Sequence, residues 1–342
     1  SSFDAVVGDE GRVSLFFGGA SGLAMSPAWS TSGQALSSFG ASVASAGDVN
    51  GDGFSDVIIG ASEHDNGATD EGRAVVFLGF ASGLPDGTSW SGFGTQSAAL
   101  LGSSVASAGD VNADGYSDVI VGAPQFDQGA PDEGVVFLYL GSPTGVLGTP
   151  RVTLAGGQAS AFFGYSVAGA GDVNGDGFGD VVIGAFGYDD PETNEGRVSV
   201  YLGDALSPLG LAPWAIESNQ ADSNFGISVA SAGDVNGDGY SDVIVGAPGF
   251  DGLFVDEGAA FVYLGSATGL TIQSWATTSS QRQASLGSSV ASAGDVNGDG
   301  FSDVIVGAPA YSNNQSNEGR VSLFAGSAMG LAVTPLATLE VN

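Results

Sequence analysis

The sequence predicts an all-β fold, a β-propeller of four-stranded antiparallel blades, on the basis of two repeated patterns and their spacing. The first pattern, Asp-x-Asn-x-Asp-Gly-x-x-Asp, occurs five times and begins at Asp48, Asp110, Asp172, Asp234 and Asp295. The second pattern, Glu-Gly before an apolar run, occurs six times, at Glu10, Glu71, Glu133, Glu195, Glu257 and Glu318. Both return every 61 or 62 residues and stay in phase. This period is typical of propeller blades, because the coils of a β-solenoid are much shorter.

Each period contains four expected strands in chain order. In the period that starts near residue 101, we expect the first strand near residues 102–108, the second near 117–122 and the third near 135–140. The fourth surrounds a position that usually holds a large residue: Trp29, Trp90, Val152, Trp214, Trp275 and Leu336. Runs such as Val-Ile-Val and Val-Phe-Leu-Tyr-Leu favour strands. No stretch has a helical period, so we expect almost no helix.

We expect residues 1–342 to form a single propeller domain. The expected full repeats are at about residues 39–100, 101–162, 163–224, 225–285 and 286–342, with a half repeat at residues 1–38. The half repeat is inferred because Phe3-Asp4 to Glu10-Gly11 aligns with Phe250-Asp251 to Glu257-Gly258, so the chain begins midway through a period. The hypothesis is a ring of six blade positions with one incomplete blade, whose open edge invites strand addition.

The charge balance excludes several classes of function. The 342 residues include 38 Asp and Glu but only six Arg, no Lys and one His, His64, which gives a formal net charge of −32. Such a chain repels nucleic acid and acidic membrane surfaces. The absence of Cys excludes disulfide and thiolate chemistry, and no apolar run is long enough for a transmembrane segment. With 43% apolar and 13% charged residues, the chain can still build a core.

The nine-residue loops carry the strongest chemical signal. Calcium takes roughly six to eight oxygen ligands, and each loop offers three Asp carboxylates, one Asn amide oxygen and one backbone carbonyl. The glycine at the sixth position, Gly53 in the first loop, is expected to allow a sharp turn where a Cβ would clash. An EF-hand is excluded, because Ile59 stands where a bidentate Glu would be needed. Unneutralised carboxylates would repel by roughly 3 kcal/mol per pair at an effective dielectric of 20, which favours a bound cation over a metal-free turn.

We therefore expect about five Ca²⁺ ions, one in each full repeat. The expected ligands, the seventh residue of each loop acting through its carbonyl, are Asp48, Asn50, Asp52, Phe54, Asp56, Asp110, Asn112, Asp114, Tyr116, Asp118, Asp172, Asn174, Asp176, Phe178, Asp180, Asp234, Asn236, Asp238, Tyr240, Asp242, Asp295, Asn297, Asp299, Phe301 and Asp303.

The same residues resemble a known family. Phe39-Gly40 before the first strand, the Asp48–Asp56 loop and Gly122-Ala123-Pro124 after the second strand resemble the FG-GAP repeat of integrin α-subunit propellers and of many bacterial surface proteins. The departures are Leu101 and Leu286 for the Phe, and Ser62 and Phe186 for the Pro. The resemblance implies that the metal loops lie on one face of the propeller and that partners bind the opposite face. The near-identity of the copies is more typical of a bacterial surface protein than of an animal integrin.

Two further features each have two interpretations. The large residue of the fourth strand could stack on sugars, but Val152 and Leu336 cannot stack, so packing between blades is favoured. The loop between the second and third strands repeats an aromatic–acid pair: Phe126-Asp127, Tyr188-Asp189 and Phe250-Asp251, with His64-Asp65 and Tyr311-Ser312 as variants. This pair could form a binding surface, yet its repetition favours inward packing and a turn capped by Asp. The Asp/Asn-Glu-Gly pattern is expected to form local ion pairs or turn caps where it is followed by Arg12, Arg73, Arg197 and Arg320.

We interpret the chain as an extracellular or cell-surface adhesion module, stabilised by calcium, that binds a protein or glycan, or copies of itself. The alternative is a structural subunit of a surface assembly or filament, joined through the incomplete blade. We assign no catalytic residue and no enzymatic activity, because each prominent acid recurs five or six times and the one His lies in a variable loop. A carboxylate pair that cleaves polysaccharide is the weakest alternative. Since the chain begins without Met, we expect a processed or excised product.

Overall fold

Every regular element of the described chain is a β-strand. The structure is a computed structural model that describes residues 10–20, 22–210, 214–271, 273–313 and 315–340. Within these residues the strands are β1 to β24, and no helix is present. The prediction of an all-β fold with four-stranded blades is confirmed.

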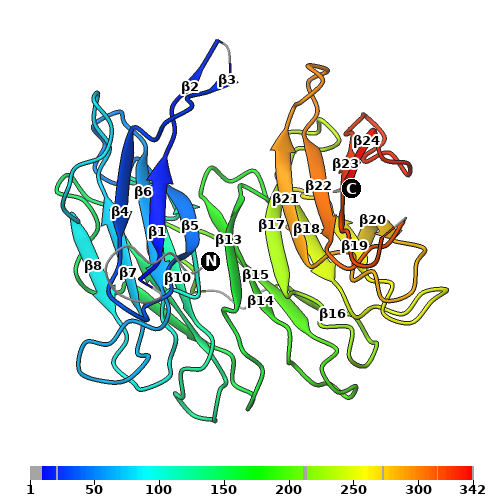
Figure 1. The fold of residues 1–342 in the computed structure, drawn as a ribbon, viewed down its shortest axis with the longest axis horizontal. Coiled ribbons are helices and arrows are strands. Elements are labelled where there is room, and N and C mark those ends of the chain that lie inside the picture. Colours follow the sequence, from blue (N-terminus) through cyan, green and yellow to red (C-terminus); the bar gives the residue numbers. More distant parts are fainter. Residues whose placement is uncertain (1–9, 21, 211–213, 272, 314, 341–342) are drawn as a thin grey trace. The chain divides into compact units, whose positions relative to one another are not determined.

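Five sheets contain four strands each, hydrogen-bonded in chain order. They are β5 (Phe39–Gly47), β6 (Asp56–Ala61), β7 (Arg73–Phe77) and β8 (Trp90–Phe93); β9 (Ser104–Gly109), β10 (Asp118–Ala123), β11 (Val135–Tyr139) and β12 (Val152–Ala155); β13 (Ser166–Gly171), β14 (Asp180–Ala185), β15 (Arg197–Tyr201) and β16 (Trp214–Glu217); β17 (Ser228–Gly233), β18 (Asp242–Ala247), β19 (Ala259–Tyr263) and β20 (Gln273–Thr278); and β21 (Ser289–Gly294), β22 (Asp303–Ala308), β23 (Arg320–Phe324) and β24 (Ala337–Glu340). Figure 1 shows the last four, β21 to β24, grouped toward the C-terminus. The strand positions expected for the second repeat agree with β9, β10 and β11.

A smaller sheet precedes these five along the chain. It pairs β1 (Arg12–Leu15) with β4 (Trp29–Ser32), and a short hairpin of β2 (Gly18–Gly19) and β3 (Gly22–Leu23) lies between them. Leu15 stands opposite Trp29, as Val76 of β7 stands opposite Trp90 of β8. The strands β1 and β4 therefore occupy the third and fourth places of a sheet, as the half repeat predicts. The aligned segment that starts at Phe3 lies outside the described residues, and the repeat boundaries and the six-position ring remain predictions.

The chain packs as two compact units. One contains residues 1–107 and 114–159, and the other contains residues 108–113 and 160–342. Within each unit, the apolar residues of successive sheets form shared cores. In the first unit, for example, Ala46, Val49 and Ile58 of one sheet pack against Val105 and Val121 of the next. The unit cores are thus built between sheets, where the apolar side chains of one sheet pack against those of the next.

In the second strands β6, β14 and β18, a glycine near the strand end sets the spacing between sheets. A Cβ at Gly60 would lie 1.9 Å from the carbonyl oxygen of Gly102 in the next sheet, and the same conflict is found at Gly184 with Gly226. Only glycine allows the two backbones to approach this closely. Gly60 and Gly184 are therefore required by packing and not by a turn.

The Trp residues of the fourth strands pack between sheets, as predicted, whereas Leu336 precedes β24 and is 56% exposed. Trp29, Trp90 and Trp275 are buried. The Trp90 ring meets the Tyr139 ring edge-on at a centroid distance of 4.7 Å, and its Nε1 donates a hydrogen bond to the carbonyl oxygen of Leu147 at 3.1 Å. Because these rings are enclosed by neighbouring strands, they do not form a platform for sugars.

Candidate metal centres and the opposite loops

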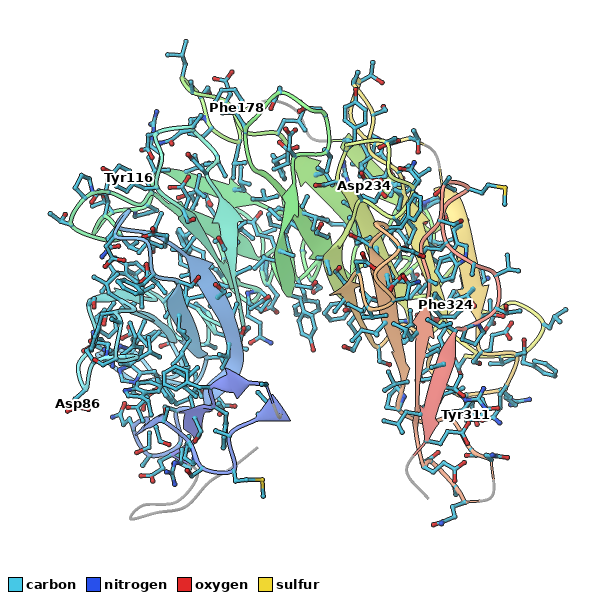
Figure 2. All side chains as sticks on the ribbon, turned by 90° about the horizontal axis from the view of Figure 1, so that it is seen from above. Asp86, Tyr116, Phe178, Asp234, Tyr311 and Phe324 are labelled. Atoms are coloured by element: carbon cyan, nitrogen blue, oxygen red, sulfur yellow. The ribbon has the colours of Figure 1, made fainter. Side chains whose placement is uncertain are left out.

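Each nine-residue loop joins the first and second strands at one end of its sheet. The loop between the third and fourth strands shares that end, and the loop between the second and third strands lies at the other end. In Figure 2, Tyr311 and Phe324 mark opposite ends of β23, and Phe324 lies at the end that carries the nine-residue loop. All five loops are thus at the equivalent end of their own sheets, as the metal-loop prediction requires.

The first Asp of the loop 48–56 accepts a nest of backbone amides. The Asp48 Oδ1 accepts hydrogen bonds from the amides of Gly51 and Asp52, at 2.7 and 3.1 Å, and its Oδ2 accepts one from Gly53 at 2.8 Å. The Asn50 Nδ2 donates to Asp52 Oδ2 at 2.9 Å. The same four bonds, between 2.6 and 3.1 Å, recur in the loops that begin at Asp172, Asp234 and Asp295. One local conformation is therefore repeated, and it brings the predicted ligand residues into one tight turn.

The sixth-position glycine is required for its backbone angle. Gly53 has φ +89°, yet a Cβ built on it would meet no atom within 4 Å. The expectation that a Cβ would clash there is wrong. A left-handed φ costs a non-glycine residue about 1–2 kcal/mol even in open space, so the glycine remains the favoured residue.

The ninth residue of each loop is a fully buried Asp. Asp56 accepts hydrogen bonds from the amide of Val49 at 2.8 Å and from that of Gly79, in the loop between β7 and β8, at 2.7 Å. Burial raises the pKa of this carboxyl, against the lowering effect of the two amides, and the nearby Asp52 and Asp48 charges raise it further. The same causes raise the pKa of Asp180 and of Asp242 to about 6. The ninth residue ties the loop to its sheet.

The composition of the loop fits a hard cation. The predicted ligands of the loop are all carboxylate, amide or carbonyl oxygens, and a carboxylate oxygen that accepts one amide, such as Asp48 Oδ2, keeps a second acceptor position. The side chains are nevertheless turned toward amides: among the residues that the structure describes, no group of three or more Asp, Glu or His side chains is arranged to hold a metal ion. Each loop thus contains the oxygen atoms that a cation would need, but in this structure their side chains are not arranged to hold the ion.

Successive loops contact one another within each unit. The amide of Ser117 donates to the Asp48 carbonyl oxygen at 2.9 Å, and that of Ser302 donates to the Asp234 carbonyl oxygen at 2.9 Å. The aromatic seventh residue of one loop covers the fourth-position glycine of the loop before it, as Tyr116 covers Gly51 and Phe301 covers Gly237. An ordered loop therefore supports its neighbour, a contact that repeat spacing alone does not reveal.

At the other end of the sheets, the aromatic–acid pairs are structural, as predicted. The rings of Phe126 and Phe250 pack edge-on against Phe137 and Phe261 in the cores. Asp127 and its counterparts accept the amide of the residue five positions later at 2.6–2.7 Å, which caps the turn. Repetition of the pair therefore reflects turn formation.

The Glu-Gly pattern and its Arg also have structural roles. The buried Glu133 accepts the amides of Gln128 and Gly157, at 2.8 and 3.0 Å. Burial acts to raise the pKa of Glu133, but hydrogen bonds from four backbone amides outweigh it and hold the pKa below its usual value. Arg320 lies 3.6 Å from the centre of the Tyr311 ring and forms an ion pair with Glu340 at 2.5 Å. The predicted ion pairs and turn caps are confirmed at these residues.

One aromatic cluster breaks the repeat, and the repeated sequence patterns do not indicate it as a site. Phe162 and Phe186 stack with their ring centres 5.1 Å apart, and Tyr165 meets Phe186 edge-on at 4.7 Å. The side chain of Tyr165 is exposed, and the other two are half-buried. In the other repeats these three positions hold Ser38, Ala41 and Ser62; Leu100, Ser103 and Pro124; Asn224, Ile227 and Pro248; and Ser285, Ser288 and Pro309. The replacement of Pro by Phe186 was the available signal, and it marks a surface found in this repeat alone.

The fold and the loops define a family. The FG-GAP repeat matches residues 39–77, 101–139, 163–201, 225–264 and 286–324, and the chain therefore belongs to the FG-GAP repeat proteins. It is similar to integrin alpha-5 of Xenopus laevis, with 36% identity over 183 residues that make up 51% of this chain and 17% of that protein. It is also 38% identical to integrin alpha-IIb of Mus musculus over 167 residues, which make up 46% of this chain and 16% of that protein. With integrin alpha-V of Gallus gallus it shares 34% identity over 206 residues, which make up 57% of this chain and 19% of that protein.

The matched part is less than a fifth of the length of each of these relatives. The described part of the chain offers no helix with the length and apolar character needed to cross a membrane.

Proposed function

We propose that the chain is an integrin-alpha-like binding module that acts outside the cell or at its surface, without enzymatic activity. The observation that carries the proposal is the run of five FG-GAP repeats together with 34–38% identity to integrin alpha subunits over about half of the chain. A net charge of −32 supports a protein or glycan partner over a nucleic acid or an acidic membrane. A bacterial origin remains a prediction from the near-identity of the repeats.

We propose further that calcium stabilises the sheets through the nine-residue loops, about one ion in each. The ligands are the side chains of the first, third, fifth and ninth residues and the carbonyl of the seventh, in the five loops that begin at Asp48, Asp110, Asp172, Asp234 and Asp295. Bound calcium would neutralise carboxylates that otherwise face one another within a single turn. The loop-to-loop hydrogen bonds would spread this ordering along each unit.

Calcium titration tests this second proposal. We expect about five sites by calorimetry, and a large fall in melting temperature in excess chelator, because an ion at 100 times its dissociation constant stabilises by about 2.7 kcal/mol. Asp238→Ala should remove one site, while Asp86→Ala, which removes an exposed acid outside the loops, should remove none. An unchanged melting temperature in chelator would rule out structural calcium.

For the ligand, we propose the cluster of Phe162, Tyr165 and Phe186 as the contact surface. It lies at the end of its sheet away from the nine-residue loop, and a ligand that binds one place requires a feature that is not repeated. An exposed aromatic ring beside two others offers a large apolar contact area at low cost in side-chain entropy.

A binding screen tests the ligand proposal. The intact chain is screened against protein and glycan arrays in calcium, and the strongest ligand is measured again with Tyr165→Ala and with Ile227→Ala, the matched position one repeat later. We expect at least a tenfold loss of affinity for Tyr165→Ala only. Equal affinity of both variants and the wild type would exclude this surface.

The second candidate function is a subunit of a surface assembly or filament. The observation that favours it is the sheet of β1 and β4, which has two strands among the described residues where five sheets have four. Regular polymers of the pure chain, seen by light scattering and electron microscopy in the absence of any ligand, would favour assembly over ligand binding.

A further inference from the structure

One of the Arg residues that begin a third strand lacks a counter-charge. Arg197 of β15 and Arg320 of β23 each stand opposite a Glu of the fourth strand and form an ion pair with it. Arg73, at the same position of β7, stands opposite Phe93 of β8. In the part of the chain that the structure describes, Arg73 forms no ion pair. Its positive charge is therefore available to attract an anion from outside the chain.

The guanidinium of Arg73 also has unused hydrogen-bond donors. Its Nη2 donates to the Ser91 Oγ at 2.8 Å, and its Cζ lies 5.2 Å from the centre of the Phe93 ring. Its Nε is buried and has no hydrogen-bond partner among the described residues. Burial lowers the pKa of Arg73, because the charged form is partly removed from water. A half-buried cation in this state is costly, and an anion that accepts its donors would offset the cost.

A small pocket of about 130 Å³ lies beside this guanidinium. The residues that line it include Thr31, Ser32, His64, Arg73, Val75 and Phe77. Thr31 and Ser32 belong to β4, whereas the others belong to β7 and to the loop that precedes it, so the pocket lies between two neighbouring sheets of the first unit. It combines hydroxyl, imidazole and guanidinium groups with apolar side chains.

The combination of side chains around the pocket is not repeated along the chain. At the position of His64 the other complete repeats hold Phe126, Tyr188, Phe250 and Tyr311. In two of them the ring packs on a Phe of the third strand, where this repeat has the smaller Val75. In the other two the ring lies against the ion-paired Arg. His64, Arg73 and Val75 thus occur together in this repeat alone, as a site for one ligand requires.

The size of the pocket matches one functional group. Its volume corresponds to about four water molecules at about 30 Å³ each, whereas sites for whole small molecules measure about 300–1,000 Å³. A carboxylate matches the guanidinium, which donates two parallel hydrogen bonds to it. The apolar Val75 and Phe77 favour a group with a methylene stem over phosphate, which has none. A whole sugar acid has many more atoms than the pocket can hold, so the end of a short acid fits best.

We propose that this pocket binds a single carboxylate on a short methylene stem, carried by a free short-chain acid or by an acidic side chain of a protein partner. The carboxylate would accept hydrogen bonds from the Arg73 guanidinium, with His64 and Thr31 as further donors, and the stem would lie against Val75 and Phe77. The net charge of −32 does not prevent this binding, because physiological salt, with a Debye length of about 8 Å, screens distant acids more than a guanidinium in contact.

His64, the single His of the chain, reports on the pocket directly. Its ring resonances are followed by nuclear magnetic resonance while the intact chain, at constant pH in about 150 mM sodium chloride, is titrated with propionate. We expect a saturable shift of these resonances, and no shift with propionamide, which has the same shape without the charge. Glutamate with both backbone ends capped distinguishes the source of the carboxylate: tighter binding than propionate indicates a side chain of a protein partner, and weaker binding indicates a free acid.

Three results of these titrations would overturn the proposal. They are the absence of a saturable shift with both acids, an equal shift with propionamide, and tighter binding of methyl glucuronide or inorganic phosphate than of propionate. The pocket belongs to the first unit, whereas the cluster of Phe162, Tyr165 and Phe186 belongs to the second. The result is therefore separate from that of the binding screen.

A change of the residue opposite Arg73 separates binding from folding. Phe93→Glu gives Arg73 the partner that Arg197 and Arg320 already have, and we expect it to weaken propionate binding at least tenfold without lowering the melting temperature. Phe93→Gln has the same length without the charge and should retain binding. Arg73→Gln should also weaken binding at least tenfold, whereas Arg197→Gln, the matched change in the second unit, should not. Unchanged affinity in Phe93→Glu and Arg73→Gln, or an equal loss in Phe93→Gln, would show that Arg73 does not hold the carboxylate.

Discussion

An Asp residue in this chain takes its role from the backbone amides that donate hydrogen bonds to it, and not from its residue type. Asp48, Asp56 and Asp127 carry the same carboxylate. Asp48 accepts three amides of its own loop, Asp56 joins the loop to the next turn of the sheet, and Asp127 closes a turn at the opposite end. Only the first two belong to a donor set suited to calcium. The −32 charge is therefore distributed over separate structural tasks.

His64 provides a test of residue-level electrostatics. Burial lowers the pKa of His64, and the nearby Arg73 charge lowers it further. The folded state then binds fewer protons than the unfolded state between the folded pKa and about 6.5. Stability contributed by neutral His64 is present above about 6.5 and is lost as the pH falls through that window.

His64→Gln should remove this loss. We expect the difference in unfolding free energy between about pH 7.5 and about pH 5 to be smaller in the variant than in the wild type, as measured by urea denaturation in calcium. An equal pH dependence of the two proteins would show that the environment of His64 does not disfavour its charge.

At the scale of the element, contact between sheets depends on one glycine in the second strands β6, β14 and β18. Gly60 meets the backbone of Gly102, whereas Gly307, the same position in the last sheet, would place a Cβ 3.6 Å from its nearest neighbour. Gly60→Ala should destabilise the chain by about 3 kcal/mol, because the obstacle is backbone that cannot move aside. Gly307→Ala should change stability by less than about 1 kcal/mol. Chemical denaturation of both variants measures the contrast, and similar costs would contradict it.

The sequence predicts the features that repeat locally and misses those that depend on contacts between sheets. Strand order, loop positions and the packing role of Trp90 follow from local patterns that repeat, and each copy supports the others. The stacking of Tyr116 on Gly51, the burial of Asp56 and the exposure of Val43 depend on which sheet lies next to which residue. The aromatic cluster of Phe162, Tyr165 and Phe186 joins two loops of one repeat, so its members are separated in sequence and only the structure unites them.

At the scale of the whole molecule, repulsion among the acidic residues opposes the compact folded state. Five divalent ions would reduce the formal net charge from −32 to −22 and would act where carboxylates are closest. Without them, repulsion among the loops and across the surface weakens the folded state. Salt screens such repulsion, since the Debye length falls from about 30 Å at 0.01 M to about 10 Å at 0.1 M.

Added salt should therefore raise the melting temperature of the chain more in chelator than in calcium. We expect the melting temperature in chelator to rise by several degrees between about 10 and about 300 mM sodium chloride, and that of the calcium-loaded chain to rise by clearly less. Asp238→Asn, which removes one loop carboxylate, should reduce the gain seen in chelator. Asp86→Asn is the matched control, because it removes the same charge outside the loops, and it should reduce the gain less. If the two variants reduce the gain equally, the repulsion is spread over the surface and is not concentrated in the loops.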